Sequence, residues 1–316
     1  MKVGVIGTGN MGENHVRTYL SMNDQCQLTG VYDNDEQKRR QVAEKYNVQQ
    51  FQSIDDLLQS VEAVSIAVPT EFHYEIGLAC IRNNVHMLME KPITSTVAQA
   101  DDLIDKASKA GVKLQVGHIE LYNPFIQMLL HLLADESIVG VTFHRISPSG
   151  SGIKDVDVVK DLMIHDIYIL NKMLKDDGSE FCALGEVIDG TPKHAVAFKR
   201  SSQGITAQLT ASFMSKRKVR NMQILTKDAF MEADLLSNTI KMTGSFIEET
   251  SNNPVPVTKT IQFEESIKPL HPQLLDFISS IKSDKDPSIT GEDGREVLIT
   301  ANQITDAIID HNELFY

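Results

Sequence analysis

Cysteine is scarce in this chain of 316 residues: Cys26, Cys80 and Cys182 stand far apart, without the spacing of a zinc site. Because disulfides form in oxidising compartments, we expect three reduced thiols and a cytoplasmic protein. No apolar run reaches the roughly 18 residues that a membrane helix requires. Glycine also interrupts the N-terminus too early for a signal peptide. We therefore expect neither a membrane partner nor a metal ion.

Positive charge is also in short supply, with 30 Lys and Arg against 43 Asp and Glu and a net charge of −13. This balance argues against a nucleic-acid partner, because such binding depends on neutralising phosphates. It still allows an anionic substrate, since a few cations in a cleft can reverse the local field. The GxSxG pattern of serine hydrolases and the GK[ST] pattern of P-loop proteins are absent.

The first part of the chain alternates short β-branched or apolar runs with helical patterns. Strands are predicted at Lys2–Ile6, Cys26–Tyr32, Ala63–Val68, Val85–Met89 and Lys113–Val116, with helices at Met11–Ser21, Asp35–Tyr46, Glu71–Arg82 and Thr96–Ala110. Strands that alternate with helices of this length predict βαβ units and a parallel sheet.

The pattern changes after about Gly117. Helices are predicted at Tyr122–Ala134, Asp161–Leu174, His271–Ile281 and Gly294–His311, and strands of period two at Val139–Ile146, Phe181–Ile188, His194–Arg200, Ile205–Phe213, Val219–Thr226 and Phe230–Leu236. The predicted fold class is α/β plus α+β: a Rossmann domain at residues 1–118, then a domain at 119–316 with an open, mainly antiparallel sheet. The last helix is expected to pack back on the first domain.

A GxGxxG motif follows the first predicted strand and opens the next helix. An acid, Asp33, ends the second strand 21 residues after Gly12, as expected where a carboxylate binds the adenosine ribose and repels a 2′-phosphate. The motif therefore predicts NAD as the cofactor. Two alternative interpretations of the motif remain: a methyltransferase, and a glycine turn that binds no ligand. The predicted contacts are Gly7, Gly9, Asn10, Met11, Gly12 and Asp33. Arg39 and Arg40, further along the chain, are predicted to be solvated.

Two other patterns carry candidate chemistry. Lys91, in Glu90-Lys91-Pro92, follows a predicted parallel strand, where such sheets bind ligands, and its ammonium can serve as an acid or a base. Pro92 is a candidate for a cis peptide bond. Asp161 and His165 are four residues apart on a predicted helix and would form an oriented acid–base pair. An exposed lysine and a surface Asp–His pair are the simpler alternatives.

The segment that follows the last parallel strand contains three candidates for a substrate cleft: His118, Tyr122 and Asn123. The alternative is that this segment is a simple hinge. An anionic substrate in so acidic a protein requires local cations. Lys154 precedes the Asp161–His165 segment, so we predict that it contacts the substrate.

Five motifs together resemble the Gfo/Idh/MocA oxidoreductase family: GTGNMGENH at 7–15, AVPTEFH at 67–73, EKP at 90–92, DLMIHD at 161–166 and GEDGRE at 291–296. The resemblance covers nearly the whole chain. It implies that Lys91, Asp161 and His165 are the catalytic residues. It also implies that four residues line the cofactor: Pro69, Thr70, His73 and Glu90.

Two segments, VGHIELYNP and IKDVDVVKDLMIHD, look like the sugar-nucleotide 3-dehydrogenases of that family. This resemblance implies NAD-dependent oxidation of a secondary sugar hydroxyl, with a nucleotide sugar at its 3-hydroxyl preferred. An inositol, free-sugar or sugar-phosphate dehydrogenase, or a non-enzymatic regulator that senses NAD or a sugar, are the alternatives. In the family the second sheet commonly buries one face in an oligomer, so we expect a homodimer or homotetramer.

Overall fold

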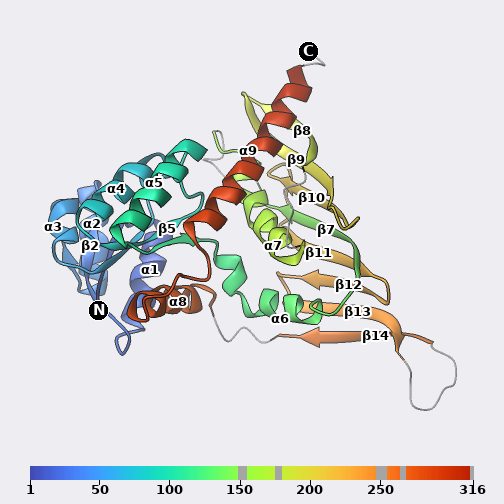
Figure 1. Cartoon of the computed structure of the whole chain (residues 1–316), viewed down its shortest axis with the longest axis horizontal. Helices are drawn as coiled ribbons and strands as arrows, with labels where there is room; N and C mark the ends of the chain where they lie inside the picture. Colours follow the sequence, from blue (N-terminus) through green and yellow to red (C-terminus); the bar gives the residue numbers. More distant parts are fainter. Residues whose placement is uncertain (149–154, 175–179, 247–254, 264–267, 314–316) are drawn as a thin grey trace. The chain divides into compact units, whose positions relative to one another are not determined.

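The computed structural model describes residues 1–148, 155–174, 180–246, 255–263 and 268–313 (Figure 1). Contacts divide the chain into two units, Met1–Tyr122 with Lys268–Leu298 and Asn123–Ile267 with Ile299–Tyr316. Each unit is therefore built from two segments that are far apart in the sequence. No described helix is both long and apolar enough to span a bilayer.

The first unit contains a six-stranded parallel sheet in the order β3-β2-β1-β4-β5-β6. The strands are β1 (Lys2–Ile6), β2 (Gln27–Tyr32), β3 (Gln49–Gln50), β4 (Ala63–Ile66), β5 (His86–Glu90) and β6 (Leu114–Gly117). The predicted Rossmann sheet is confirmed. The strand order reverses between β1 and β4, and open sheets of this kind bind ligands at the carboxyl ends of the strands there.

Helices cover both faces of this sheet. They are α1 (Asn10–Leu20), α2 (Glu36–Tyr46), α3 (Ile54–Leu58), α4 (His73–Arg82), α5 (Val97–Ala110) and α8 (Leu270–Lys282), with 3₁₀ turns η1 (Thr70–Phe72) and η2 (Ile119–Tyr122). Figure 1 shows α4 and α5 on one side and α1 and α8 on the other. Helix α8 adds Leu274 and Phe277 to the core that Val16 and Tyr19 of α1 form. The short helix α3 was not predicted, because five residues are too few for a helical period to emerge.

The second unit contains an eight-stranded sheet in the order β14-β13-β12-β11-β7-β10-β9-β8. Its strands are β7 (Ile138–Ile146), β8 (Cys182–Ile188), β9 (Thr191–Arg200), β10 (Thr206–Ser212), β11 (Val219–Thr226), β12 (Ala229–Asp234), β13 (Thr239–Phe246) and β14 (Val255–Gln262). All neighbours are antiparallel except β7 and β10. The predicted, mainly antiparallel sheet is confirmed. Strands β13 and β14 were not predicted from the sequence.

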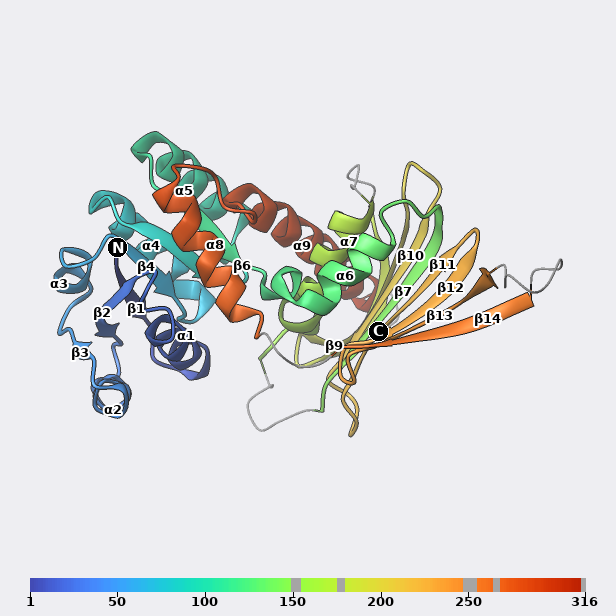
Figure 2. The same ribbon diagram turned by 90° about the horizontal axis from the view of Figure 1, so that it is seen from below.

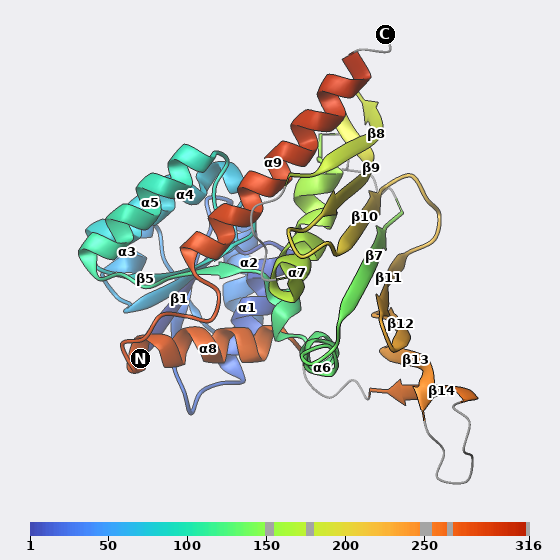
Figure 3. The ribbon, with the colours of Figure 1, turned by 45° about the vertical axis from the view of Figure 1, so that its right-hand side comes forward.

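Helices α6 (Pro124–Leu132) and α7 (Ile164–Leu174) lie on one face of this sheet (Figures 2 and 3). Helix α9 (Gly291–Glu313) begins in the first unit and ends in the second. Figure 2 shows no described helix on the other face, which we call the open face. Alternate side chains of the strands point to it, among them Leu184, Phe198 and Phe230, all of them exposed.

The helix predicted at Asp161–Leu174 has a different form in the structure. A π-helical turn, η3 (Val159–Met163), precedes α7, so Asp161 and His165 stand on two kinds of turn. Tyr168 of α7 is buried. The prediction missed the π-helical turn because helical periodicity does not report a change of helix type.

Candidate active site

The loop between β1 and α1 can be built only with glycine at two positions. Gly7 has a φ of +91°, and a Cβ there would collide with the carbonyl oxygen of Ala67. A Cβ on Gly12 would collide with the carbonyl oxygen of Gly7, so helix and strand could not pack this closely. Gly9, by contrast, faces open space and ends the loop without a side-chain cap on α1. The N-terminus of α1, at Asn10 and Met11, is therefore suited to an anionic group.

Asp33 follows β2, and its carboxylate is held by the chain itself. One oxygen accepts hydrogen bonds from the Thr8 backbone N–H at 2.6 Å and the Thr8 hydroxyl at 2.9 Å. The other oxygen accepts one from the Asp35 backbone N–H at 2.9 Å. These contacts fix the carboxylate beside the glycine loop, with lone pairs remaining for a ligand's hydroxyl groups.

A cavity of about 520 Å³ opens beside this carboxylate. It is lined by Ile6, Gly7, Gly9, Tyr32, Asp33, Asn34, Lys38, Ile54, Ala67, Val68, Pro69, Phe72, Glu75 and Ile76. Its volume is typical of a cofactor site, and its mainly apolar walls with a few polar side chains, Asp33 among them, suit an adenosine. Sequence reasoning did not single out Ile54, which lies in no motif, or Phe72, which lies within AVPTEFH.

Arg39 is buried, so the prediction that it is solvated was wrong, whereas Arg40 is exposed as predicted. The Arg39 guanidinium donates to the carbonyl oxygen of Asp33 at 2.7 Å and to Gln52 Oε1 at 2.9 Å, and it lies over the Tyr32 ring. Arg39 thus supports the backbone that carries Asp33, and it is absent from the lining of the cavity.

The EKP segment lies at the carboxyl end of β5. Glu90 is the last residue of the strand, Lys91 is half-buried, and the Lys91–Pro92 peptide bond is cis. His15, on α1, lies 3.0 Å from the Glu90 carboxylate, measured from Nε2 to Oε1. Neither the EKP motif nor the glycine motif alone indicates this contact between them.

His73 joins the two segments predicted to line the cofactor. It is fully buried, with Nδ1 2.9 Å from the carbonyl oxygen of Pro92 and Nε2 3.0 Å from that of Val68. Burial lowers the pKa of this imidazole, although the nearby carbonyl groups oppose the shift. The ring therefore contacts the backbone of both segments, and His73 itself is not among the residues that line the cavity. Pro69 lines the cavity itself, and Thr70 begins η1 beside it.

In the second unit, Asp161 lies in the π-helical turn and His165 is the second residue of α7, half-buried. Asp157 holds the start of this segment: its carboxylate accepts the Val159 N–H at 2.8 Å and the Thr305 hydroxyl at 2.7 Å. π-helical turns occur often at functional sites, where they change the direction of side chains.

The predicted substrate residues are placed as follows. His118 is buried, and the Tyr122 hydroxyl donates to Asp276 at 2.6 Å and accepts from Gln115 at 2.9 Å. Asn123 caps α6, its side chain accepting the Phe125 N–H at 3.0 Å. Lys154 lies outside the described residues. A substrate role for these four residues stays a prediction.

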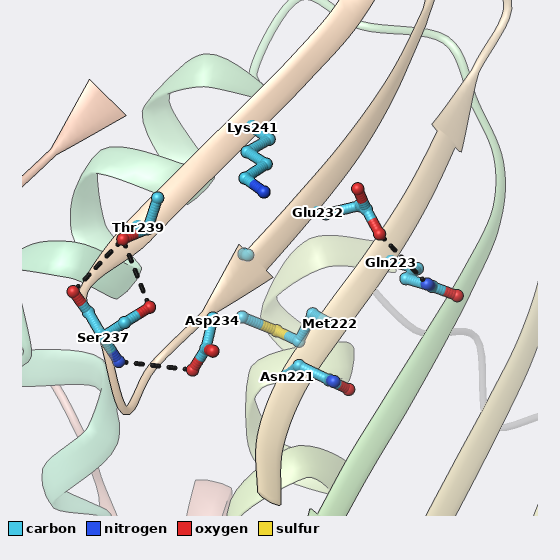
Figure 4. Close-up of a pocket in the computed structure, with 9 residues that line it drawn as sticks. Asn221, Met222, Gln223, Glu232, Asp234, Ser237, Thr239 and Lys241 are labelled. Carbon is cyan, nitrogen blue, oxygen red and sulfur yellow. Dashed lines mark hydrogen bonds between the residues drawn. The ribbon is translucent and has the colours of Figure 1, made fainter. Parts of the chain in front are cut away.

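A second hollow, of about 380 Å³, lies on the open face of the second sheet (Figure 4). Asn221, Gln223, Glu232, Asp234 and Lys241, from β11, β12 and β13, are among its lining residues. It contains none of the predicted site residues. Among the residues that the structure describes, no group of three or more His, Cys, Asp or Glu could hold a metal ion.

Comparison with known proteins agrees with this geometry. Residues 1–118 match the model of the Gfo/Idh/MocA oxidoreductase family, described as its NAD-binding Rossmann fold. The chain is 29% identical to UDP-N-acetylglucosamine 3-dehydrogenase of Acidithiobacillus ferrooxidans over 98% of this chain and 97% of that protein. The crystal structure of that enzyme covers 98% of both chains with a TM-score of 0.89.

A myo-inositol 2-dehydrogenase of Thermotoga maritima is 23% identical over 95% of this chain and 93% of its own length. The glycine loop, the acid after β2 and the family match all concern the same segment of the chain. The first unit therefore has the NAD-binding Rossmann fold of the Gfo/Idh/MocA oxidoreductases, which match residues 1–118, and the cofactor is NAD.

Proposed function

We propose that the protein oxidises a secondary hydroxyl of a sugar with NAD, and that its substrate is a nucleotide sugar oxidised at the 3-hydroxyl. The observation that carries this proposal is the similarity to UDP-N-acetylglucosamine 3-dehydrogenase, which extends over nearly the full length of both chains. It includes the second unit, where substrate specificity is expected to reside.

Three residues of this chain would perform the proton chemistry. His165 would remove the hydroxyl proton, Asp161 would orient the imidazole, and Lys91 would hydrogen-bond the reacting oxygen and stabilise its developing charge. The roles of His165 and Lys91 could be exchanged. NAD, when bound, supplies the acceptor for the hydride.

The cofactor half of the site fits NAD on the contacts described above. The helix N-terminus at Asn10 would face the pyrophosphate, and the Asp33 carboxylate would accept hydrogen bonds from the ribose hydroxyls. Both features lie at the same carboxyl edge of the sheet as the 520 Å³ cavity.

The test is a screen of the purified protein with NAD and UDP-sugars, sugar phosphates, free sugars and inositols. Turnover is read as absorbance of the reduced nicotinamide, and binding as thermal stabilisation, because a ligand that binds the folded state raises its stability. We expect turnover with a UDP-N-acetylhexosamine. Turnover with inositol or glucose, and none with any UDP-sugar, would contradict the proposed substrate. The proposal that the protein is an NAD-dependent dehydrogenase would still stand.

An inositol dehydrogenase is the second candidate, supported by the similarity to the Thermotoga maritima enzyme. The same screen separates the two, because an inositol carries no phosphate and a nucleotide sugar carries two. Binding of NAD and a sugar without turnover across the whole panel would instead indicate a regulator.

We also propose that two copies of the chain associate through the open face. Leu184, Phe198 and Leu225 are exposed there by 50%, 41% and 47%, and exposed apolar surface of this kind often marks an interface. Sedimentation should show a dimer or tetramer that Leu184→Glu with Phe198→Glu dissociates. Met128→Glu, at an exposed position on α6, is the matched control and should leave the mass unchanged. A monomeric parent protein at all concentrations would refute the association.

A further inference from the structure

Lys91, the proposed catalytic lysine, lies between Glu90 and Pro92 in the sequence, and a buried histidine contacts each of these two residues. Glu90, before Lys91, meets His15, and the carbonyl oxygen of Pro92, after it, meets His73. His15 and His73 are both fully buried. They come from two different helices, α1 and α4, so the segment is held from two directions.

The His15 contact is the more specific of the two, because it engages a side chain. His15 Nε2 lies 3.0 Å from Glu90 Oε1, and the exposed fractions of the two side chains are 0% and 12%. Among the described residues, His15 Nδ1 has no hydrogen-bond partner. A carboxylate oxygen can only accept, so the imidazole that fits this site carries its proton on Nε2 and donates it to Glu90.

Gly117 forms the opposite wall of the Glu90 side chain. It is paired with Glu90 in the register of β5 and β6. A Cβ on Gly117 would come 2.8 Å from Glu90 Oε2 and 2.9 Å from Glu90 Cδ. The carboxylate therefore lies between an imidazole donor on one side and a residue without a side chain on the other.

We propose that His15 is a positioning residue, which holds the Glu90 carboxylate against Gly117 and thereby fixes the backbone from which Lys91 reaches its substrate. The inference rests on the proposed role of Lys91. A half-buried carboxylate without this donor would turn toward other donors or toward water, because a buried acceptor left unpaired is unfavourable. The strand end would move with it, and a displacement of about 1 Å at a reacting group can reduce turnover 100-fold.

The first experiment compares His15→Gln with His15→Leu in the full-length enzyme with NAD and its sugar substrate. Glutamine keeps an N–H donor near the position of Nε2, whereas leucine keeps volume without a donor. We expect His15→Leu to lower kcat roughly 10- to 100-fold and His15→Gln to restore it to within a few-fold of the parent. Equal loss in both variants, or no loss in His15→Leu, would overturn the proposal.

Tyr19→Phe is the matched control. Tyr19 lies one turn further along α1, with its ring centroid 6.5 Å from that of His15, and its hydroxyl shares a hydrogen bond with Ser65 Oγ at 2.8 Å. This variant loses a buried hydrogen bond that the same helix makes to β4. It should therefore be less stable than the parent protein, whereas its kcat should be unchanged. A fall in kcat as large as that of His15→Leu would show that loosening of α1 is responsible, and would overturn the proposal.

Gly117→Ala displaces the same carboxylate from the other side and serves if His15→Leu does not fold. It should also lower kcat about 10-fold or more, and full activity would count against the proposal. In the unmodified enzyme, nitrogen NMR of labelled histidine should show the His15 proton on Nε2, assigned by its absence from His15→Gln. A proton on Nδ1 alone would overturn the proposal.

The NMR measurement does not depend on the role of Lys91. If Lys91→Ala keeps full turnover, the proposed function fails even when His15 shows the expected tautomer. If Lys91→Ala is inactive and His15→Leu is fully active, the positioning role fails and the proposed function stands.

Discussion

Arg145 of β7 donates three hydrogen bonds to the carboxylate of Asp166 on α7, two from Nε at 2.9 and 3.0 Å and one from Nη2 at 2.7 Å. Both side chains are buried, with exposed fractions of 3% and 5%. Asp166 directly follows His165, so the pair ties the first turn of α7 to the sheet. This contact locates the proposed catalytic histidine within the second unit.

Removal of one partner should destabilise the protein strongly. Arg145→Met removes the guanidinium from a buried carboxylate, so we expect a loss of about 3–5 kcal/mol in the free energy of unfolding. The double variant Arg145→Met with Asp166→Leu should recover much of it, because two apolar groups need no partner. Urea unfolding measures both. Lys106→Ala, which breaks an exposed pair with Asp102, is the control and should change stability little.

Replacement of Lys91 should lower the rate of hydride transfer more than the affinity for NAD. We expect Lys91→Ala to lower the hydride-transfer rate at least ~100-fold, the lower range for acid–base catalysis, while NAD still binds. Single-turnover absorbance measures the rate and fluorescence titration measures binding. Lys109→Ala, an exposed lysine paired with Asp105, is the control. Near-normal turnover in Lys91→Ala would remove it from the proposed mechanism.

Cofactor preference should depend on Asp33. Because its carboxylate is held in place by Thr8 and Asp35, it should repel the 2′-phosphate of NADPH, and NADH should bind more tightly. Asp33→Ala should bind both cofactors more weakly and with a smaller preference. Titration of both reduced cofactors into parent, Asp33→Ala and Asp24→Ala tests this. The remote Asp24→Ala should keep the parent's preference, and equal affinities in the parent would rule out this role.

Stability should fall on mild acidification, in part through His73. Burial lowers the pKa of His73 below its value in the unfolded chain, so the unfolded state binds more protons as the pH drops below about 6.5. The contribution of His73 is present above that pH and decreases below it, until the folded-state pKa is reached. Burial also lowers the pKa of His86, so His86 contributes to the fall in stability with decreasing pH in the same direction.

Urea unfolding of the parent protein and of His73→Gln between pH 7.5 and 5.5 measures how much His73 contributes to the pH dependence of the free energy of unfolding. The pH dependence should be smaller in His73→Gln, which has no imidazole to protonate. His131→Gln, at an exposed position, is the control and should keep the parent's slope. An identical slope in parent and His73→Gln would contradict the prediction.

The sequence by itself determined the local features of this protein. The parallel sheet was predictable because buried strands and short helices alternate, and the glycine loop was predictable because GxGxxG requires a strand before it and a helix after it. The placing of Asp33 and of the EKP segment at carboxyl ends of strands followed from the same alternation. Each of these inferences uses residues within about 30 positions of one another.

Only the tertiary structure decided which side chains meet. His15 and Glu90 are 75 residues apart, and Asp157 and Thr305 are 148 apart, so no local period connects either pair. The burial of Arg39 depends on Gln52 and on the backbone of Asp33, and solvation cannot be inferred from charge alone. The π-helical turn before α7 is likewise set by its anchors, Asp157 at one end and the Arg145–Asp166 pair at the other, because packing decides helix geometry where local propensity does not.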